Sequence, residues 1–361
     1  MPFRKSIPAV CLSITLIVAA FAEAPVRDGR FLFEQETFGG NGRACQTCHS
    51  PETGTVSPID AQRRFAMNRL DPLFRHDGTD DGQGQGVQRM LTEATVVVEI
   101  PLPSNVRLAD DVSARTVKVR RGIPSTLNTP ALDTVLMQDG REPNLQSQAL
   151  NAIRGHAQAP GPVSTADLEA IARFQVSDRF FSSPALREFA RGGPGPQLPV
   201  GVTDSEKRGR RFFEDRVDPK DLKVGSCSVC HSGPLLNQPN QFFPVPGLRM
   251  VSVNVSEFNQ ARNPVRPFVF RNADGSETTI MSPDPGRALI TGRVQDANAF
   301  KITPLRGIRR TAPYFHDNSA RTLEDVAAHY ARLFAIFDPR NPVILTAQDQ
   351  ADMVAYMKLL D

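Results

Sequence analysis

The stretch Cys45-Gln46-Thr47-Cys48-His49 has the pattern C-x-x-C-H, which returns once as Cys227-Ser228-Val229-Cys230-His231. This pattern is the attachment motif of a c-type heme, whose vinyl groups bond both cysteines while the adjacent imidazole ligates the iron. The alternative is a disulfide or redox C-x-x-C with an incidental histidine, a coincidence that would have to occur twice. Cysteines elsewhere are limited to Cys11. We therefore expect two covalently bound heme c groups, with His49 and His231 on the irons.

The bulk composition is that of a soluble globular protein. The 361 residues are 40% hydrophobic and 22% charged, with a net charge of +3, which gives no reason to expect nucleic-acid binding. Thirty prolines and 25 glycines indicate long loops. Together with the two motifs, this predicts a mainly α protein made of two fused cytochrome c-like heme domains with long loops.

The N-terminus has the features of an export signal. Arg4 and Lys5 precede the apolar segment 7–22, and Ala20-Phe21-Ala22 provides a cleavage site before Glu23. A membrane anchor is the alternative, but about 16 apolar residues are short for a span. We predict a signal peptide over residues 1–22, which discards Cys11, no membrane span after processing, and a periplasmic protein.

The clearest break in the chain is Gly192-Gly193-Pro194-Gly195-Pro196. It predicts a first heme domain over residues 23–191, a linker over 192–203 and a second heme domain over 204–361. Gly29-Arg30-x-x-Phe33-Glu34 before the first motif matches Gly209-Arg210-x-x-Phe213-Glu214 before the second. This match indicates an internal duplication, and we expect Phe31 and the apolar positions around it to pack towards the first heme.

Residues 51–120 are less informative. The segment 77–82 is acidic and rich in glycine, so a calcium loop and a solvated turn are both open there, with the turn favoured because EF-hand spacing is absent. Residues 92–100 are typical of a strand. Residues 235–298 are predicted to be an insertion of loops and short strands.

The run Thr311-Ala312-Pro313-Tyr314-Phe315-His316, following a second C-x-x-C-H, closely resembles the bacterial diheme cytochrome c peroxidase/MauG family. The resemblance covers about residues 27 to 335. It implies a peroxidatic first heme and an electron-transfer second heme. The expected activity is reduction of hydrogen peroxide with electrons from a small cytochrome c or cupredoxin. The resemblance also allows a homodimer.

The resemblance implies roles for residues around the second heme. Its sixth ligand, fourteen residues after the histidine of Tyr-Phe-His, is Tyr330. Methionine occupies this place in the peroxidases and tyrosine in MauG-like members. The alternatives are a packed tyrosine, with His329, Met281 or nothing on the iron. His316 is expected near the second heme or between the hemes, or else as a structural histidine.

The family binds a calcium ion between its domains through backbone oxygens that correspond to Thr311 and Pro313. The third family ligand, an asparagine, falls on Gly122, which offers only a carbonyl. Calcium is therefore an expectation with an incomplete ligand set.

Two departures concern catalysis. The family's inter-heme tryptophan falls on Gln138, and the chain has no tryptophan. The family's distal glutamate falls on Gln158, which can orient peroxide but cannot carry its proton. His156 is then a candidate base, a candidate sixth ligand of the first heme or a surface histidine, while the family's glutamine is retained as Gln148.

Three functions follow from these residues. The first is a cytochrome c peroxidase-type oxidoreductase. The second is MauG-like oxidation of a partner protein, which Tyr330 favours. The third is a non-enzymatic diheme electron carrier with both irons capped, which the missing tryptophan and distal acid favour.

Overall fold

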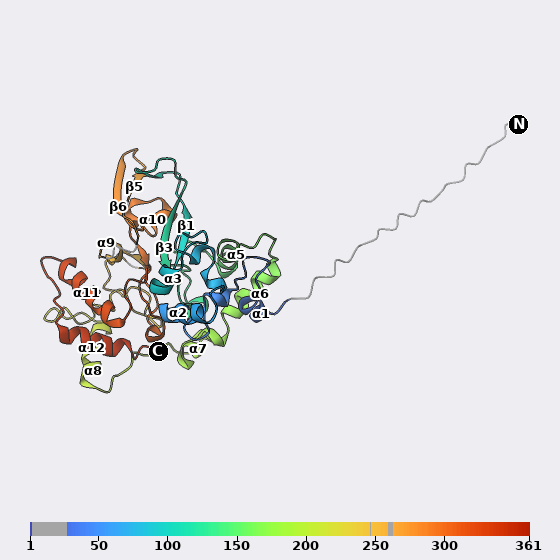
Figure 1. Cartoon of the computed structure of the whole chain (residues 1–361). Coiled ribbons are helices and arrows are strands. Elements are labelled where there is room, and N and C mark those ends of the chain that lie inside the picture. The colour runs from blue at the N-terminus through green and yellow to red at the C-terminus, as the bar shows by residue number, and fades with distance from the viewer. Residues whose placement is uncertain (2–26, 246, 259–262) are drawn as a thin grey trace.

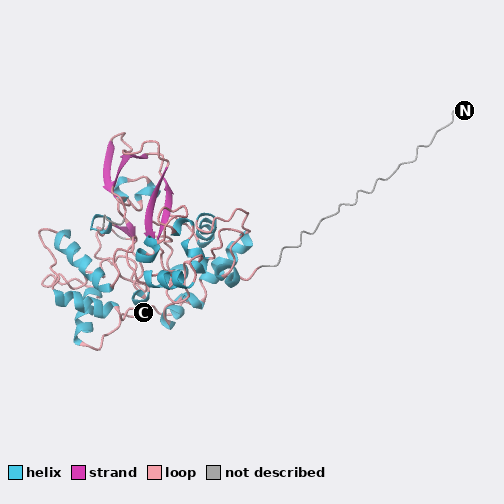
Figure 2. Cartoon of the chain, viewed as in Figure 1, coloured by secondary structure: helices cyan, strands magenta, loops and turns pink. Residues whose placement is uncertain are grey.

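The computed structural model describes Met1 and residues 27–245, 247–258 and 263–361. Apart from Met1, the predicted signal peptide lies outside the described residues. Figure 1 shows one helical lobe from the blue-to-green part of the chain, a second from the orange and red part, and an extension above them. Figure 2 shows that the strands gather in this extension.

The first lobe is built on two crossing helices, α1 (Gly29–Glu34) and α6 (Thr165–Gln175), and α5 (Leu145–Gly155) packs against α6. Their apolar faces form one core, in which Leu32 and Ile171 are fully buried. The other helices of this half are α2 (Pro58–Met67), α3 (Gln88–Glu93), α4 (Thr129–Leu132) and α7 (Pro184–Ala190).

The second lobe repeats this arrangement with α8 (Asp204–Arg210), α11 (Leu323–Phe337) and α12 (Ala347–Met357). Helix α12 packs against both of the others. In the core between them, the rings of Phe213 and Tyr356 lie 5.3 Å apart.

Glycines occupy the helix crossing in both lobes. A Cβ on Gly29 would lie 2.1 Å from the carbonyl oxygen of Ala170, and one on Gly209 would lie 2.0 Å from that of Asp352. Only a hydrogen fits at such a distance, so the two helix backbones touch there. The predicted internal duplication therefore extends to the way the helices cross.

The extension joins the two halves of the chain. Strand β1 (Thr95–Pro101) pairs antiparallel with β3 (Thr116–Gly122). Strand β2 (Val106–Leu108), from the first half, pairs with β5 (Arg266–Arg271) from the second, and β5 pairs with β6 (Glu277–Ser282). The prediction of a strand at 92–100 is confirmed, and that of a mainly α protein holds only in part.

Alternating burial explains why these segments are strands. In β3, Val117 and Val119 are buried while Lys118 is exposed, so one face packs on the core and the other meets water. The core of the extension is shared by both halves of the chain: Leu108 on β2 and Phe268 on β5 are buried in it together. Helix α10 (Ala288–Thr291) packs on this core through Ala288 and Leu289. The remaining elements of this half are the strand pair β4 (Met250–Val251) and β7 (Phe300–Lys301) and the short helix α9 (Val255–Phe258).

Residues 192–203 contain no helix or strand, as expected for a linker. The segment is nevertheless held in place by hydrogen bonds from the second half of the chain. The Arg306 guanidinium donates to the carbonyl oxygen of Pro196 at 2.7 Å. Because β2 and β5 come from opposite sides of this segment, the extension belongs to neither half alone. Within the described residues, no helix is both long and apolar enough to cross a bilayer.

Candidate heme-binding sites

His49 and His231 have equivalent surroundings. The Nδ1 of His49 lies 2.8 Å from the carbonyl oxygen of Gly54, and the Nδ1 of His231 lies 2.8 Å from that of Leu236. A carbonyl only accepts, so each Nδ1 carries the proton and each Nε2 presents its lone pair for a metal. Burial lowers the pKa of both histidines, which favours the neutral imidazole that an iron ligand requires.

The four cysteines of the two motifs are not joined in disulfides. Burial raises the pKa of Cys45 and Cys227 to about 12 and that of Cys230 to about 11. Thiols with such values stay protonated and react poorly in thiol–disulfide exchange. With no disulfide between them, the four sulfurs are available for the thioether bonds of two hemes.

An open cavity lies beside the first motif. Its walls are mainly apolar, and they include Cys45, Cys48 and His49 together with Gln148 and His156. A large apolar cavity with a few convergent polar groups is the usual form of a cofactor site. The residues present fit a heme held by the first motif, with two polar side chains beside it.

Cationic side chains also line this cavity, namely Arg121, Arg141 and Lys301. Each of them already pairs with a buried carboxylate, Arg121 and Arg141 with Asp139 and Lys301 with Asp133, so they bring little unpaired positive charge to the carboxylates of a heme.

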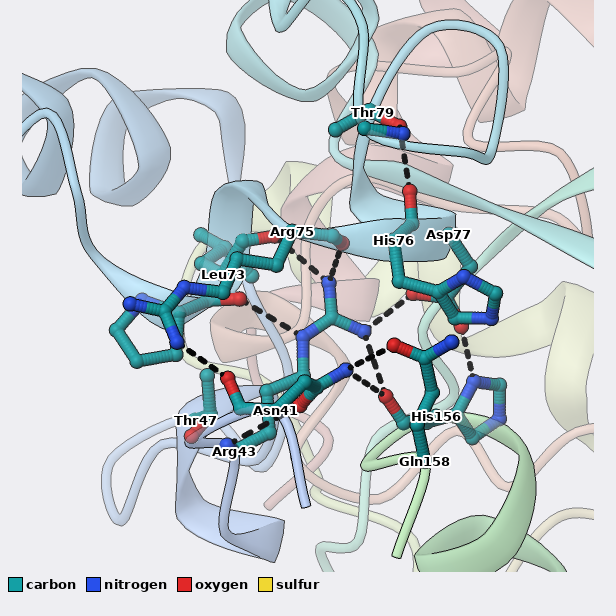
Figure 3. Close-up of polar contacts among 12 residues, drawn as sticks. Asn41, Arg43, Thr47, Leu73, Arg75, His76, Asp77, Thr79, His156 and Gln158 are labelled. Atoms are coloured by element: carbon teal, nitrogen blue, oxygen red, sulfur yellow. Dashed lines mark hydrogen bonds and ion pairs between the residues drawn. The ribbon is translucent and has the colours of Figure 1, made fainter.

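His156 is held by a buried carboxylate. It caps the C-terminus of α5, and its Nδ1 lies 2.5 Å from the Oδ2 of Asp77. The other carboxylate oxygen of Asp77 accepts from the Arg43 guanidinium, as Figure 3 shows. Burial alone would raise the pKa of Asp77, but His156 and Arg43 outweigh it and hold the pKa below its ordinary value.

Gln158 is placed differently from His156 and Gln148, which line the cavity. Its Oε1 accepts from the side-chain amide of Asn41 at 3.1 Å, in an exposed contact visible in Figure 3. It is not among the described residues that line the cavity. The structure therefore brings Gln148 and His156 to the first site and leaves Gln158 at its outer edge.

Tyr330 lies near the second motif. It is part of α11 and packs on the core of the second lobe, as Cys227 does. Burial, followed by the charges of Cys230 and Cys227, raises the pKa of Tyr330. The phenol is thus close enough to both cysteine sulfurs to interact with them.

The alternatives to Tyr330 are placed elsewhere. The Nε2 of His329 lies 2.7 Å from the carbonyl oxygen of Val253, so this ring nitrogen already has a partner. Met281 is on β6 and 60% exposed.

His316 is buried between the two halves. Its ring stacks on Phe300 with centroids 3.6 Å apart, and its carbonyl oxygen accepts from the backbone N–H of Gly122 at 2.7 Å. Burial lowers the pKa of His316. Gln138, at the place of the family's tryptophan, lines the first cavity and donates to the carbonyl oxygen of Gly122 at 3.3 Å.

The residues expected to bind calcium form an incomplete set. The carbonyl of Gly122 is engaged by Gln138, and a Cβ on Gly122 would lie 2.1 Å from the Oδ1 of Asn318. Asn318 in turn donates to the carbonyl oxygens of Glu93 and Ala94 at 2.9 and 3.0 Å. The space beside Gly122 is thus filled by a side chain that crosses between the halves, while Thr311 and Pro313 remain as the predicted carbonyl donors.

The acidic loop at 77–82 is a turn held by its own backbone. The Oδ1 of Asp81 accepts from the backbone N–H groups of Gln83, Gly84 and Gln85 at 2.8, 3.1 and 3.0 Å. These bonds lower the pKa of Asp81 to about 2. Its carboxylate is satisfied without a cation, which supports the turn and not the calcium loop.

Sequence reasoning missed Asp77 and Arg43. Asp77 stood in the acidic loop, where nothing in the pattern distinguished it from Asp80 or Asp81. Arg43 precedes Cys45 by two residues. A basic residue so close to a heme motif was the one feature of the sequence that could have indicated a role for Arg43 at this site.

No family model matches the chain. Cytochrome c551 peroxidase of Nitrosomonas europaea is 26% identical over 225 residues, which are 58% of this chain and 58% of that protein. Cytochrome-c peroxidase IdrP2 of Pseudomonas sp. (strain SCT) is 22% identical over 355 residues, which are 92% of this chain and 79% of that protein.

A solved MauG-like protein associated with microbial copper homeostasis superposes with a TM-score of 0.52 at 21% identity, over 92% of this chain and 86% of that one. At this identity the likeness concerns the fold. The chain is thus similar in sequence to bacterial cytochrome c peroxidases and shares the fold of a MauG-like protein.

Proposed function

We propose that this protein is a periplasmic diheme oxidoreductase that reduces hydrogen peroxide at its first heme with electrons delivered through its second. The observation that carries the proposal is the cavity beside His49, on whose wall an imidazole, His156, is held by the carboxylate of Asp77. The relatives named cytochrome c peroxidases support the same reaction.

Peroxide reduction consumes two electrons and two protons and yields two waters. A heme bound at His49 supplies the iron that binds peroxide and exchanges its electrons. The Nε2 of His156 accepts the first proton of peroxide and returns it to the departing oxygen, the task of the family's glutamate. Gln148, on the same wall, orients the peroxide through its amide.

At the second site, His231 and Tyr330 are the proposed iron ligands. An anionic phenolate stabilises ferric iron and lowers the reduction potential, whereas methionine raises it. Tyr330 also favours the second candidate function, MauG-like oxidation of a partner protein. Electrons from a small cytochrome c or cupredoxin would enter here, and His316 and Phe300 occupy the space between the halves.

The two carbonyls of Thr311 and Pro313 do not complete a calcium site with Gly122. We therefore assign calcium no step in the reaction.

The test is stopped-flow absorbance of the fully reduced protein mixed with a slight excess of hydrogen peroxide. Reoxidation of both hemes within milliseconds to seconds supports the peroxidase, and catalytic oxidation of a reduced small cytochrome c separates it from MauG-like chemistry. Reoxidation over many minutes, with an absorption spectrum that cyanide does not change, would mean that both irons are capped and that the protein is an electron carrier.

A further inference from the structure

The geometry points to Asp77 as a positioning residue that fixes the tautomer of His156, with Arg43 fixing Asp77 in turn. This inference rests on the proposed function, because it assigns a task to the neighbour of the proposed proton acceptor. Neither residue belongs to the heme motifs.

The contacts of Asp77 determine which nitrogen of His156 carries the proton. A carboxylate is only an acceptor, so the Nδ1 that lies 2.5 Å from its Oδ2 is protonated. The Nε2, the other ring nitrogen, then carries the lone pair. Because His156 lines the cavity, this places a proton acceptor at the first site.

Arg43 makes the position of Asp77 rigid. Its guanidinium donates to the carboxylate and also to the carbonyl oxygens of Pro72, Leu73 and Arg75, at 2.8, 2.9 and 2.5 Å. It also reaches the carbonyl oxygen of His156 at 3.2 Å. Figure 3 shows the Arg43 guanidinium surrounded by these groups.

Burial gives these contacts their strength. Arg43 is 2% exposed and Asp77 is 4% exposed, so water competes little for their hydrogen bonds. Arg43 also lies two residues before Cys45, so it couples the loop that carries Asp77 to the heme-attachment turn.

A purely structural ion pair is built differently. The carboxylate of buried Asp139 accepts from two guanidinium groups, those of Arg121 and Arg141. Asp77 divides its oxygens between one arginine and one imidazole. Its negative charge stabilises the imidazolium that forms when Nε2 takes a proton from peroxide, and that proton leaves again on the departing oxygen.

The informative variant is Asp77→Asn. Arg43 has only donors, so it holds the amide oxygen and turns the NH₂ towards His156. That NH₂ donates to Nδ1, which moves the ring proton to Nε2 and removes the acceptor from the cavity. The variant keeps the size of the side chain and changes the tautomer.

The experiment measures the association rate of cyanide with the ferric diheme protein, together with the rate of the peroxide reaction. Hydrogen cyanide must give up a proton to bind as the anion, so its association reports the proton acceptor even if peroxide is not the substrate. We expect Asp77→Asn to slow both rates by about 10²- to 10⁴-fold, the usual contribution of a positioned acid–base group.

A double-mutant cycle with His156→Ala shows whether Asp77 acts through His156. In the His156→Ala background, we expect Asp77→Asn to change the rates by less than about twofold, because the coupled effect is already lost. The matched control is Asp71→Asn, which removes a carboxylate in the same loop that pairs with Arg64 at 2.6 Å. This control is expected to leave both rates unchanged.

Rates equal to wild type in Asp77→Asn, or full slowing that persists in the His156→Ala background, would overturn the inference. If Asp77→Asn does not mature with two hemes, Asp77→Glu enters the same cycle, where at least tenfold slowing and the same loss of additivity are expected. If His156→Ala itself changes neither rate, the proposed role of His156 fails. Loss of the Asp77 effect alone leaves that role standing.

Discussion

The proximal histidines of the two sites are alike, and the residues opposite them differ. Both His49 and His231 use Nδ1 to bond a backbone carbonyl five residues further along. The first site adds an imidazole backed by a carboxylate, whereas the second adds a phenol inside an apolar core. One duplicated unit thus carries, in the function proposed above, a first site open to peroxide and a second site closed by Tyr330.

Replacing Tyr330 by methionine should raise the reduction potential of the second heme. A neutral thioether no longer stabilises ferric iron, and axial ligands cover a range of about 0.8 V. We expect an increase on the order of 0.2 V or more in a spectroelectrochemical titration, with the potential of the first heme little changed.

The control for this change is Tyr356→Phe, which removes a hydroxyl that donates to the carbonyl oxygen of Pro199 at 2.9 Å in the same lobe. It is expected to cost about 1 kcal/mol of stability without moving either potential. If Tyr330→Met leaves both potentials and the absorption spectrum unchanged, Tyr330 is not a ligand.

Candidate site residues that belong to a local motif could be predicted from the sequence. Those whose place depends on contacts between distant parts of the chain could not. His49, His231 and the cysteines follow from spacing alone. For His156 the sequence left three roles open: a base, a sixth ligand of the first heme and a surface histidine. Its partner Asp77 is 79 residues away in the chain, and only the fold shows that the two meet.

At the scale of the element, short helices limited what periodicity could predict. Phe31 and the apolar positions around it are predicted to pack towards the heme; Phe31 is 43% exposed, whereas its neighbour Phe33 lines the cavity. Helix α1 has six residues, fewer than two turns, so the pattern could not fix its buried face.

The crossing of α8 and α12 should not tolerate a methyl group at Gly209. An alanine Cβ there would lie 2.0 Å from the carbonyl oxygen of Asp352 and 2.8 Å from the Cβ of Tyr356, so the helices must separate. We expect Gly209→Ala to lower the free energy of unfolding by about 1–3 kcal/mol, measured by denaturant titration.

Gly155→Ala is the matched control, since Gly155 ends α5 and a Cβ there has nothing within 4 Å. This substitution should stabilise the protein by about 0.4–1 kcal/mol, because alanine has less freedom in the unfolded chain. Equal stabilities for the two variants would show that the helices do not touch at Gly209.

For the whole molecule, the sequence indicated two domains and an insertion but not what joins them. Strand β2 pairs with β5 across about 160 residues, a pairing that no local pattern specifies. The boundaries at 192–203 remain a prediction, since the extension draws its strands from both sides of that segment.

Chelation tests the calcium expectation for the whole molecule. Asn318 already spans the halves beside Gly122, so we expect dialysis against EDTA to leave the thermal midpoint and the heme spectrum unchanged. A lower midpoint that calcium restores would show that Thr311 and Pro313 bind the ion after all.

The two halves are also joined by a buried ion pair, in which Arg121 donates to both carboxylate oxygens of Asp284 at 2.8 and 2.9 Å. Burial alone would raise the pKa of Asp284, but Arg121 outweighs it and holds the pKa below the ordinary value of 3.8. The stability contributed by this lowered pKa is present above that value and is lost as the pH falls through the folded-state pKa.

Asp284→Asn should therefore lower the free energy of unfolding at pH 7 by about 3–5 kcal/mol, because it leaves a buried guanidinium without its full charge partner. The variant should also lose less stability than wild type between pH 5 and 3. The control is Asp110→Asn, whose partner Arg266 also lies in the other half but in an exposed pair, so this variant should change the free energy of unfolding little. If both variants unfold with the same free energy at pH 7, the buried pair does not hold the halves together, and the joining energy lies in the apolar core of the extension.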